Sequence, residues 1–176
     1  GKINENSIKF EKLIGLRSDK CIFRYSVHSG KIQSFKNDEN KLLLSVNSSG
    51  WTDNPSMESL DPNSICGKIL LIDVNEKNYE VYSSGHRNII GLYSDKNIIL
   101  STEHGPYSGD EINNIKNKKS YGWPVASYGE RYSRGNSDDV PFYKKSHKSN
   151  GFVEPIFSFI PAIGISEIIK LPNNFS

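Results

Sequence analysis

The stretch KILLIDVNEKNYEVYSSGHRNIIGLYSDKNIILS, residues 68–101, decides the fold class. It holds four short apolar runs that are separated by polar residues, including the connections 73–78 and 94–96. Each run has the length of a strand, is bounded by Gly, Asn, Asp or Ser, and has no room for a stable helix. Connections this short predict that successive strands pair antiparallel with their neighbours.

The same pattern extends toward the N-terminus, where a further polar connection lies at 36–40. Six strands are predicted in all: 32–35, 41–46, 68–72, 79–82, 88–93 and 97–101. The two "strand, turn, strand" units at 32–46 and 88–101 recur at a spacing that is typical of propeller blades, roughly 40–50 residues. Periodicity alone does not separate a propeller from a β-sandwich.

Composition supports short strands over long helices. Only 35% of the 176 residues are hydrophobic, while 14 Gly and 8 Pro supply frequent turns. The formal net charge is +2, with both signs interspersed, so the chain lacks the basic stripe that a phosphate backbone requires. We expect no nucleic-acid partner. No apolar run reaches the length of a membrane span, and we expect none.

The two cysteines and the chain ends carry further expectations. Cys21 and Cys66 are too few for a disulfide framework or a zinc site, and we expect them to be small buried side chains. The chain starts without Met and stops at Ser176. We therefore expect a fragment, and any export signal would lie upstream of it.

Two segments interrupt the strand pattern. Residues 102–132 are rich in Gly, Asn, Lys and Tyr, and they predict a long ordered functional loop with one helical turn after Asp110. Residues 131–149 include Lys144, Lys145 and Lys148 and predict a solvated surface excursion.

Five short motifs occur in one order along the chain: GKILLID at 67–73, GHRN at 85–88, TEHGP at 102–106, GDEIN at 109–113 and YGWP at 121–124. Together they resemble the second and third quarters of the soluble aldose dehydrogenases that depend on pyrroloquinoline quinone (PQQ), the glucose/sorbosone dehydrogenases. VHSGKI at 27–32 resembles the histidine-glycine segment of that family, and PAIGIS at 161–166 resembles a later family segment less closely. The likeness covers about residues 25–165.

This resemblance implies an all-β fold, with residues 1–176 forming about half of a six-bladed β-propeller, or roughly three blades of four antiparallel strands. It implies an exported, periplasmic or secreted, quinoprotein that oxidises an aldose sugar at its anomeric carbon. The hydride would pass to PQQ and then to an external electron acceptor.

The resemblance also assigns roles to individual residues. His28 would be the catalytic base, since imidazole titrates near neutral pH; the alternative is a half-buried histidine at a strand end. Arg87 and Asn88 would meet PQQ, because a guanidinium binds planar oxyanions in bidentate fashion. Gly85 and Gly91 beside them indicate a backbone held close to another group. Tyr132 would face the cofactor.

Calcium is the second cofactor that the resemblance implies. In one branch of the family it is held by backbone carbonyls, which here match Gly105 and Pro106. In another branch the matching residues are Glu111, through its carboxylate, and Tyr121, through its carbonyl. The irregular segment 102–124 is therefore predicted to bind calcium more readily than magnesium.

Two departures from the family pattern keep a second function open. Ser48 stands where family members usually carry an aspartate that orients the histidine, and Ile89 and Ile90 stand where Pro-Gln usually follows the asparagine. The alternative is a cofactor-free propeller of the same ancestry that binds a carbohydrate or a protein.

Overall fold

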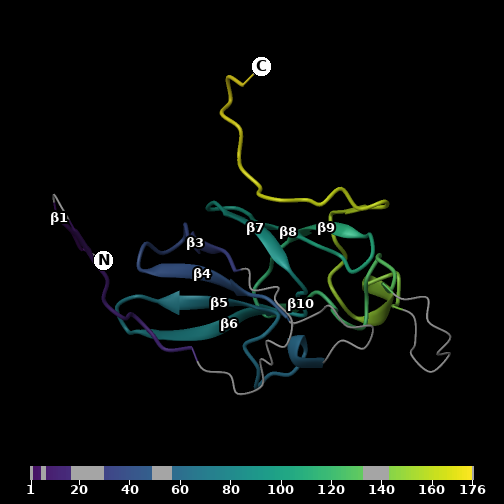
Figure 1. Cartoon of the computed structure of the whole chain (residues 1–176), viewed down its shortest axis with the longest axis horizontal. Coiled ribbons are helices and arrows are strands. Elements are labelled where there is room, and N and C mark those ends of the chain that lie inside the picture. The colour runs from purple at the N-terminus through teal and green to yellow at the C-terminus, as the bar shows by residue number, and fades with distance from the viewer. Residues whose placement is uncertain (1, 5–6, 17–29, 49–56, 133–142, 176) are drawn as a thin grey trace.

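The computed structural model describes residues 2–4, 7–16, 30–48, 57–132 and 143–175, and within them the fold is all-β (Figure 1). The helical content of these residues is two short 3-10 turns, η1 (Met57–Ser59) and η2 (Lys148–Asn150). The predicted all-β class is confirmed. No helix in these ranges is both long and apolar enough to cross a membrane.

The first sheet has the strand order β10-β6-β5-β4-β3. Its strands are β3 (Ile32–Ser34), β4 (Lys41–Val46), β5 (Lys68–Asp73), β6 (Asn78–Ser84) and β10 (Lys119–Ser120). The four sequential strands pair antiparallel, as predicted, whereas β10 pairs parallel with β6.

The second sheet has the order β11-β9-β8-β7, with every neighbouring pair antiparallel. Its strands are β7 (Ile89–Ser94), β8 (Ile99–Glu103), β9 (Asp110–Asn114) and β11 (Phe157–Phe159). A separate N-terminal hairpin pairs β1 (Lys2–Asn4) with β2 (Ser7–Lys9).

Three tight turns are stabilised in the same way, by an aspartate side chain that accepts a backbone hydrogen bond. The Oδ1 atoms of Asp38, Asp73 and Asp95 each accept the backbone N–H two residues further on, at 2.8–3.0 Å. A short acidic side chain satisfies a turn amide in this way and so favours the turn over a continued strand. The polar connections predicted from the sequence are these turns.

The hydrophobic core lies between the two sheets. β5 is buried almost throughout, which explains its uninterrupted apolar run. The cluster combines residues from both sheets and from the segment that follows β9: Leu43, Ile69, Leu71, Ile89, Leu92, Ile99, Ile115 and Tyr121. Figure 1 shows the resulting arrangement, with β7 close to β3 and β4.

Three expectations need correction. Asp110 begins strand β9 and not a helical turn, so the predicted long loop is divided by β9 and β10. Residues 143–149 are not a fully solvated excursion, since Tyr143 and His147 are buried. Cys66 is buried as predicted but is disulfide-bonded. The only other cysteine in the sequence, Cys21, lies outside the described residues.

Candidate active site

Arg87 and Asn88 lie where the chain passes from β6 into β7. Gly85 makes this passage possible, because its φ of 72° belongs to the left-handed region and a Cβ there would lie 2.6 Å from the backbone nitrogen of Gly122. Gly91 is equally crowded, since a Cβ would lie 2.9 Å from the nitrogen of Ile168. The predicted close approach at both glycines is confirmed, and the neighbour is another backbone segment.

The Arg87 side chain is held on several sides. Nη1 donates a hydrogen bond to the carbonyl oxygen of His104 at 3.0 Å, and Nη2 lies 3.5 Å from the Tyr132 hydroxyl. The guanidinium carbon lies 5.3 Å from the centre of a Trp123 ring, within cation–π range. Two predicted cofactor residues, Arg87 and Tyr132, are thus brought together.

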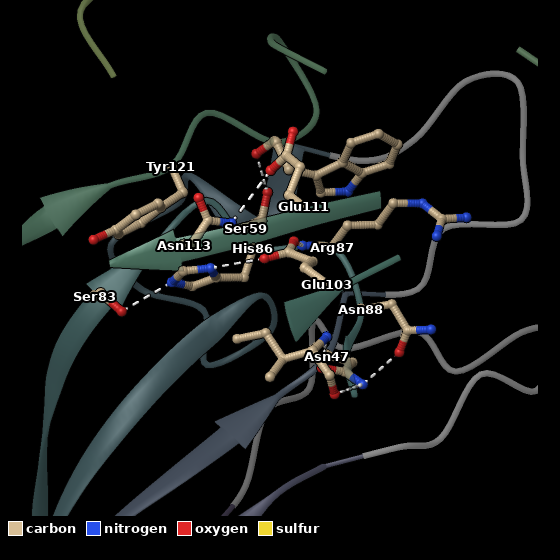
Figure 2. Close-up of polar contacts among 12 residues, drawn as sticks. Asn47, Ser59, Ser83, His86, Arg87, Asn88, Glu103, Glu111, Asn113 and Tyr121 are labelled. Carbon is tan, nitrogen blue, oxygen red and sulfur yellow. Dashed lines mark hydrogen bonds and ion pairs between the residues drawn. The ribbon is translucent and has the colours of Figure 1, made fainter. Parts of the chain in front are cut away.

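Asn88 is fixed by a residue that sequence reasoning had not singled out. Asn47, just after β4, donates through Nδ2 to Asn88 Oδ1 at 2.6 Å and accepts the backbone N–H of Ile89 through Oδ1 at 3.0 Å. Figure 2 shows the Arg87 and Asn88 side chains extending on the same side of this cluster.

Behind Arg87 lies a buried relay of three side chains. Glu103 accepts the backbone N–H of Arg87 through Oε1, and its Oε2 lies 3.2 Å from His86 Nδ1. His86 Nε2 in turn lies 2.8 Å from the Ser83 hydroxyl. The order Ser, His, Glu resembles a hydrolytic triad. Because Ser83, His86 and Glu103 are each at most 5% exposed, the hydroxyl cannot reach a substrate, and the relay instead anchors the Arg87 backbone.

A second buried carboxylate, Glu111, lies on β9 (Figure 2). Its Oε2 accepts a hydrogen bond from Asn113 Nδ2 at 3.3 Å, and its Oε1 lies 3.3 Å from His147 Nε2. Burial raises the pKa of Glu111. Burial alone would lower the pKa of His147, but contacts with the Glu111 carboxylate and the Tyr121 carbonyl, with the nearby charge of Glu154, together outweigh it and raise that pKa. The two groups are in contact and titrate as a coupled pair, and both pKa values are raised.

Tyr121 contacts the same histidine from the other side. Its carbonyl oxygen accepts a hydrogen bond from His147 Nδ1 at 2.8 Å, and the His147 ring also stacks on Tyr128. The Tyr121 hydroxyl points elsewhere, donating to the carbonyl of Asn114, and burial raises its pKa to about 12. The carbonyl is therefore the Tyr121 oxygen that faces the site.

Gly105 and Pro106 lie in the turn that follows β8, where the Gly105 N–H donates to Asp110 Oδ1 at 3.2 Å. Arg87, Gly105, Glu111 and Tyr121 line one pocket, together with Glu103 and Trp123. Within the described ranges no group of three or more His, Cys, Asp or Glu side chains is arranged to hold a metal ion. A cation bound here would therefore need carbonyl or amide oxygens to complete its coordination.

The structure thus gathers seven of the eight predicted site residues in one region, and the eighth, His28, lies outside the described residues. Four residues that contact the predicted site residues were not themselves predicted: Asn47, Glu103, Trp123 and His147. Glu103 and Trp123 belong to the TEHGP and YGWP motifs, so the motifs already contained the signal for them. The sequence contained no such signal for His147, because the residues that it contacts are distant in sequence.

Comparison with known proteins shows what the chain is similar to. The sequence profile of the family described as Glucose / Sorbosone dehydrogenase matches residues 2–174. The aldose sugar dehydrogenase YliI of Escherichia coli is 45% identical over 56 residues, which are 31% of this chain and 15% of that protein.

Two solved structures are similar in fold and sequence. A crystal structure of a glucose dehydrogenase matches with a TM-score of 0.62 at 26% identity, over 77% of this chain and 41% of that one. The PQQ-bound aldose sugar dehydrogenase of Streptomyces coelicolor matches with a TM-score of 0.54 at 28% identity, over 75% of this chain and 35% of that one. The chain spans less than half the length of these structures.

Proposed function

The chain belongs to the glucose/sorbosone dehydrogenase family, and from this premise we propose that it is part of a PQQ-dependent dehydrogenase that oxidises aldose sugars at the anomeric carbon. The family is one of sugar oxidoreductases, and one of the solved structures similar to this chain is the PQQ-bound form of an aldose sugar dehydrogenase. We further propose that the two sheets are blades of a six-bladed propeller, of which this chain is about half.

The observation that carries the proposal is the fixed orientation of Arg87. PQQ bears three carboxylates and two adjacent quinone oxygens, which suit a planar guanidinium. Trp123 on one face and the His104 carbonyl at Nη1 restrict the rotamers of Arg87, so little conformational entropy would be lost on binding. Asn88 and the Tyr132 hydroxyl add neutral hydrogen-bonding groups on either side. This donor set fits the cofactor.

The supporting residues would hold these donors in place. Glu103 fixes the backbone of Arg87, and Asn47 fixes both the Asn88 side chain and the start of β7. Because these supports are buried and come from separate parts of the chain, the donors would keep their geometry while substrate enters and leaves.

When bound, PQQ would supply the acceptor for the hydride that leaves the anomeric carbon. The proton of the anomeric hydroxyl must go to a base, and His28 is the residue that the family resemblance assigns to this role. Ser48 replaces the usual aspartate partner of that base. Its backbone N–H donates to the Arg87 carbonyl at 2.9 Å, so in this chain position 48 contributes to holding Arg87.

Calcium is proposed as the second cofactor. Gly105 lines the same pocket as Arg87, and the carbonyls of Gly105 and Pro106, in the turn after β8, would be the ligands of the cation. Glu111 and the Tyr121 carbonyl form the other candidate pair, but in this structure the His147 ring lies between them.

We propose a periplasmic or secreted location and an external electron acceptor. The disulfide at Cys66 supports the location, because such bonds persist in oxidising compartments and are rare in the cytosol.

The test is PQQ binding by the natural full-length protein, followed through the quinone absorbance. Arg87→Ala should weaken binding by about 10- to 150-fold, since charge-assisted hydrogen bonds contribute roughly 1.5–3 kcal/mol. Lys96→Ala removes a positive charge from the exposed turn between β7 and β8 and should change nothing. Equal affinity in Arg87→Ala and wild type would overturn the proposal.

A cofactor-free binding module is the second candidate, and Ser48 in place of the aspartate favours it. Saturable sugar binding with no PQQ binding in the same titrations would select this candidate.

A further inference from the structure

His147 occupies a position between two oxygens. Its Nδ1 donates to the Tyr121 carbonyl at 2.8 Å, while its Nε2 lies 3.3 Å from Glu111 Oε1. The two nitrogens of an imidazole point away from each other, so the oxygens lie on opposite sides of the ring. Their separation is therefore the width of the ring plus two contact distances.

This separation excludes a shared cation. Oxygen ligands of calcium lie 2.3–2.6 Å from the ion, so two of them cannot be held apart by an aromatic ring. In this conformation Glu111 and the Tyr121 carbonyl cannot coordinate one calcium ion together. The ring must leave before they can.

A third buried oxygen lies on the same strand as Glu111, two residues further along, and makes no hydrogen bond among the described residues. Among the described residues, Asn113 Oδ1 has no partner although the side chain is buried, and its Nδ2 donates to Glu111 Oε2. A buried carbonyl oxygen without a donor is costly, and amide oxygens are good calcium ligands. Figure 2 shows the Asn113 side chain beside that of Glu111.

The segment that carries His147 is held against residues 125–129 by hydrogen bonds. Lys144 exchanges backbone hydrogen bonds with Val125 and Ser127, and Lys145 Nζ donates to the Gly129 carbonyl at 2.7 Å. The ring itself is 2% exposed and stacks on Tyr128. The histidine is thus delivered into the site by residues 143–150, and retraction of this segment would free the oxygens.

We propose that His147 and calcium are alternative occupants of one site, whose ligands are the Glu111 carboxylate, the Tyr121 carbonyl and the Asn113 amide oxygen. The inference rests on the calcium part of the proposed function and extends it with an internal competitor and a further ligand. Calcium binding then includes the free energy of displacing the ring. The apparent affinity for calcium is the intrinsic affinity multiplied by the fraction of molecules in which the ring has left the site.

The experiment is a calcium titration of the natural full-length protein by calorimetry, with magnesium in parallel. His147→Ala should bind calcium about tenfold or more tightly than wild type, because it removes the competitor. His147→Asn should give a smaller gain, because its amide can keep the bond to the Tyr121 carbonyl while releasing Glu111. Lys148→Ala, an exposed neighbour on the same segment, is the matched control and should behave as wild type.

Two double variants test the ligands. Adding Glu111→Gln or Asn113→Leu to His147→Ala should abolish the gain in calcium affinity. A gain that survives both, or a calcium affinity of His147→Ala no higher than that of wild type, overturns the inference. If His147→Ala does not fold, His147→Asn serves in its place, with circular dichroism as the check.

Failure of the inference and failure of the proposed function are separable. PQQ absorbance titrations on the same variants, without calcium, report the cofactor site alone. A higher calcium affinity in His147→Ala with no PQQ binding would contradict the dehydrogenase proposal and support competition between His147 and calcium. PQQ binding with no rise in calcium affinity would support the dehydrogenase proposal and contradict the competition.

Discussion

The carboxylate of Glu103 accepts a hydrogen bond from the backbone amide of Arg87, so a buried side chain on β8 fixes the position of the candidate cofactor arginine. The same carboxylate contacts His86 through its other oxygen. One side chain thus satisfies two buried groups at the point where β6 passes into β7.

Glu103→Ala should therefore be strongly destabilising. It leaves the Arg87 amide and the His86 ring without their acceptor, at a cost of roughly 2–5 kcal/mol in the free energy of unfolding. Urea denaturation measures this loss. Ser101→Ala is the matched control on the same strand: Ser101 is buried and its hydroxyl makes no hydrogen bond among the described residues, so little should change.

Asn47→Ala should lower both stability and PQQ affinity. It removes the acceptor of the Ile89 amide and the donor to Asn88, which costs about 1–3 kcal/mol in unfolding free energy. Asn47→Asp restores only the acceptor and should recover the part of the stability that depends on Ile89. If Asn47→Ala changes neither denaturation nor the PQQ titration, Asn88 is not held in the way described.

Gly85→Ala should be more harmful than Gly151→Ala. Both glycines have φ in the left-handed region, so both variants incur about 1–2 kcal/mol of backbone strain. At Gly85 the new Cβ also meets the Gly122 nitrogen, whereas at Gly151 no atom lies within 4 Å. The difference between the two unfolding free energies measures the close approach, and equal values would contradict it.

Tyr128→Phe should reduce stability at neutral pH, with an effect that fades in acid. The Tyr128 hydroxyl donates to the Glu154 carboxylate. Burial alone would raise the pKa of Glu154, but this bond and the backbone N–H of Lys148 outweigh it and lower that pKa. A lowered folded-state pKa means that the stabilisation is complete above the ordinary glutamate pKa and is lost as the pH falls through the folded value.

At alkaline pH the stabilisation depends on pH in the opposite sense. Contact with Glu154 raises the pKa of Tyr128 to about 12, so its contribution is complete below the ordinary tyrosine pKa, about 10, and is lost as the pH rises through the folded value. The melting-temperature difference between wild type and Tyr128→Phe should be constant between about pH 6 and 9 and shrink outside that range. Tyr79→Phe, on the exposed part of β6, is the control. A difference independent of pH would rule out the pairing.

The strands that could be predicted are those whose buried side chains are apolar. β5 and β7 carry their signal in Ile and Leu, and Asp73 and Asp95 mark the turns that follow them. β9 escaped prediction because its sequence, DEINN, is polar, yet Asp110, Glu111 and Asn113 are buried. Glu111 among them lines the candidate site, and a hydrophobic pattern cannot reveal a strand whose buried residues are polar.

Motif resemblance could place Arg87, Asn88, Glu111 and Tyr121 near one another, and the structure brings them together. It could not supply His147, since nothing in the sequence around position 147 distinguishes a buried histidine from the surface lysines beside it. Only the three-dimensional contact with Glu111 and the Tyr121 carbonyl reveals its position.

The parallel pairing of β10 with β6 bears on how the chain is assembled during synthesis. Strands β3 to β6 leave the ribosome before β7, β8 and β9. Among the described residues, the outer edge of β6 finds its partner only when residues 119–120 arrive, after those three strands have been made. The first sheet is thus closed by a strand that comes after three strands of the second. For that interval the nascent chain carries an open strand edge, which is the feature through which unfinished β proteins associate with one another.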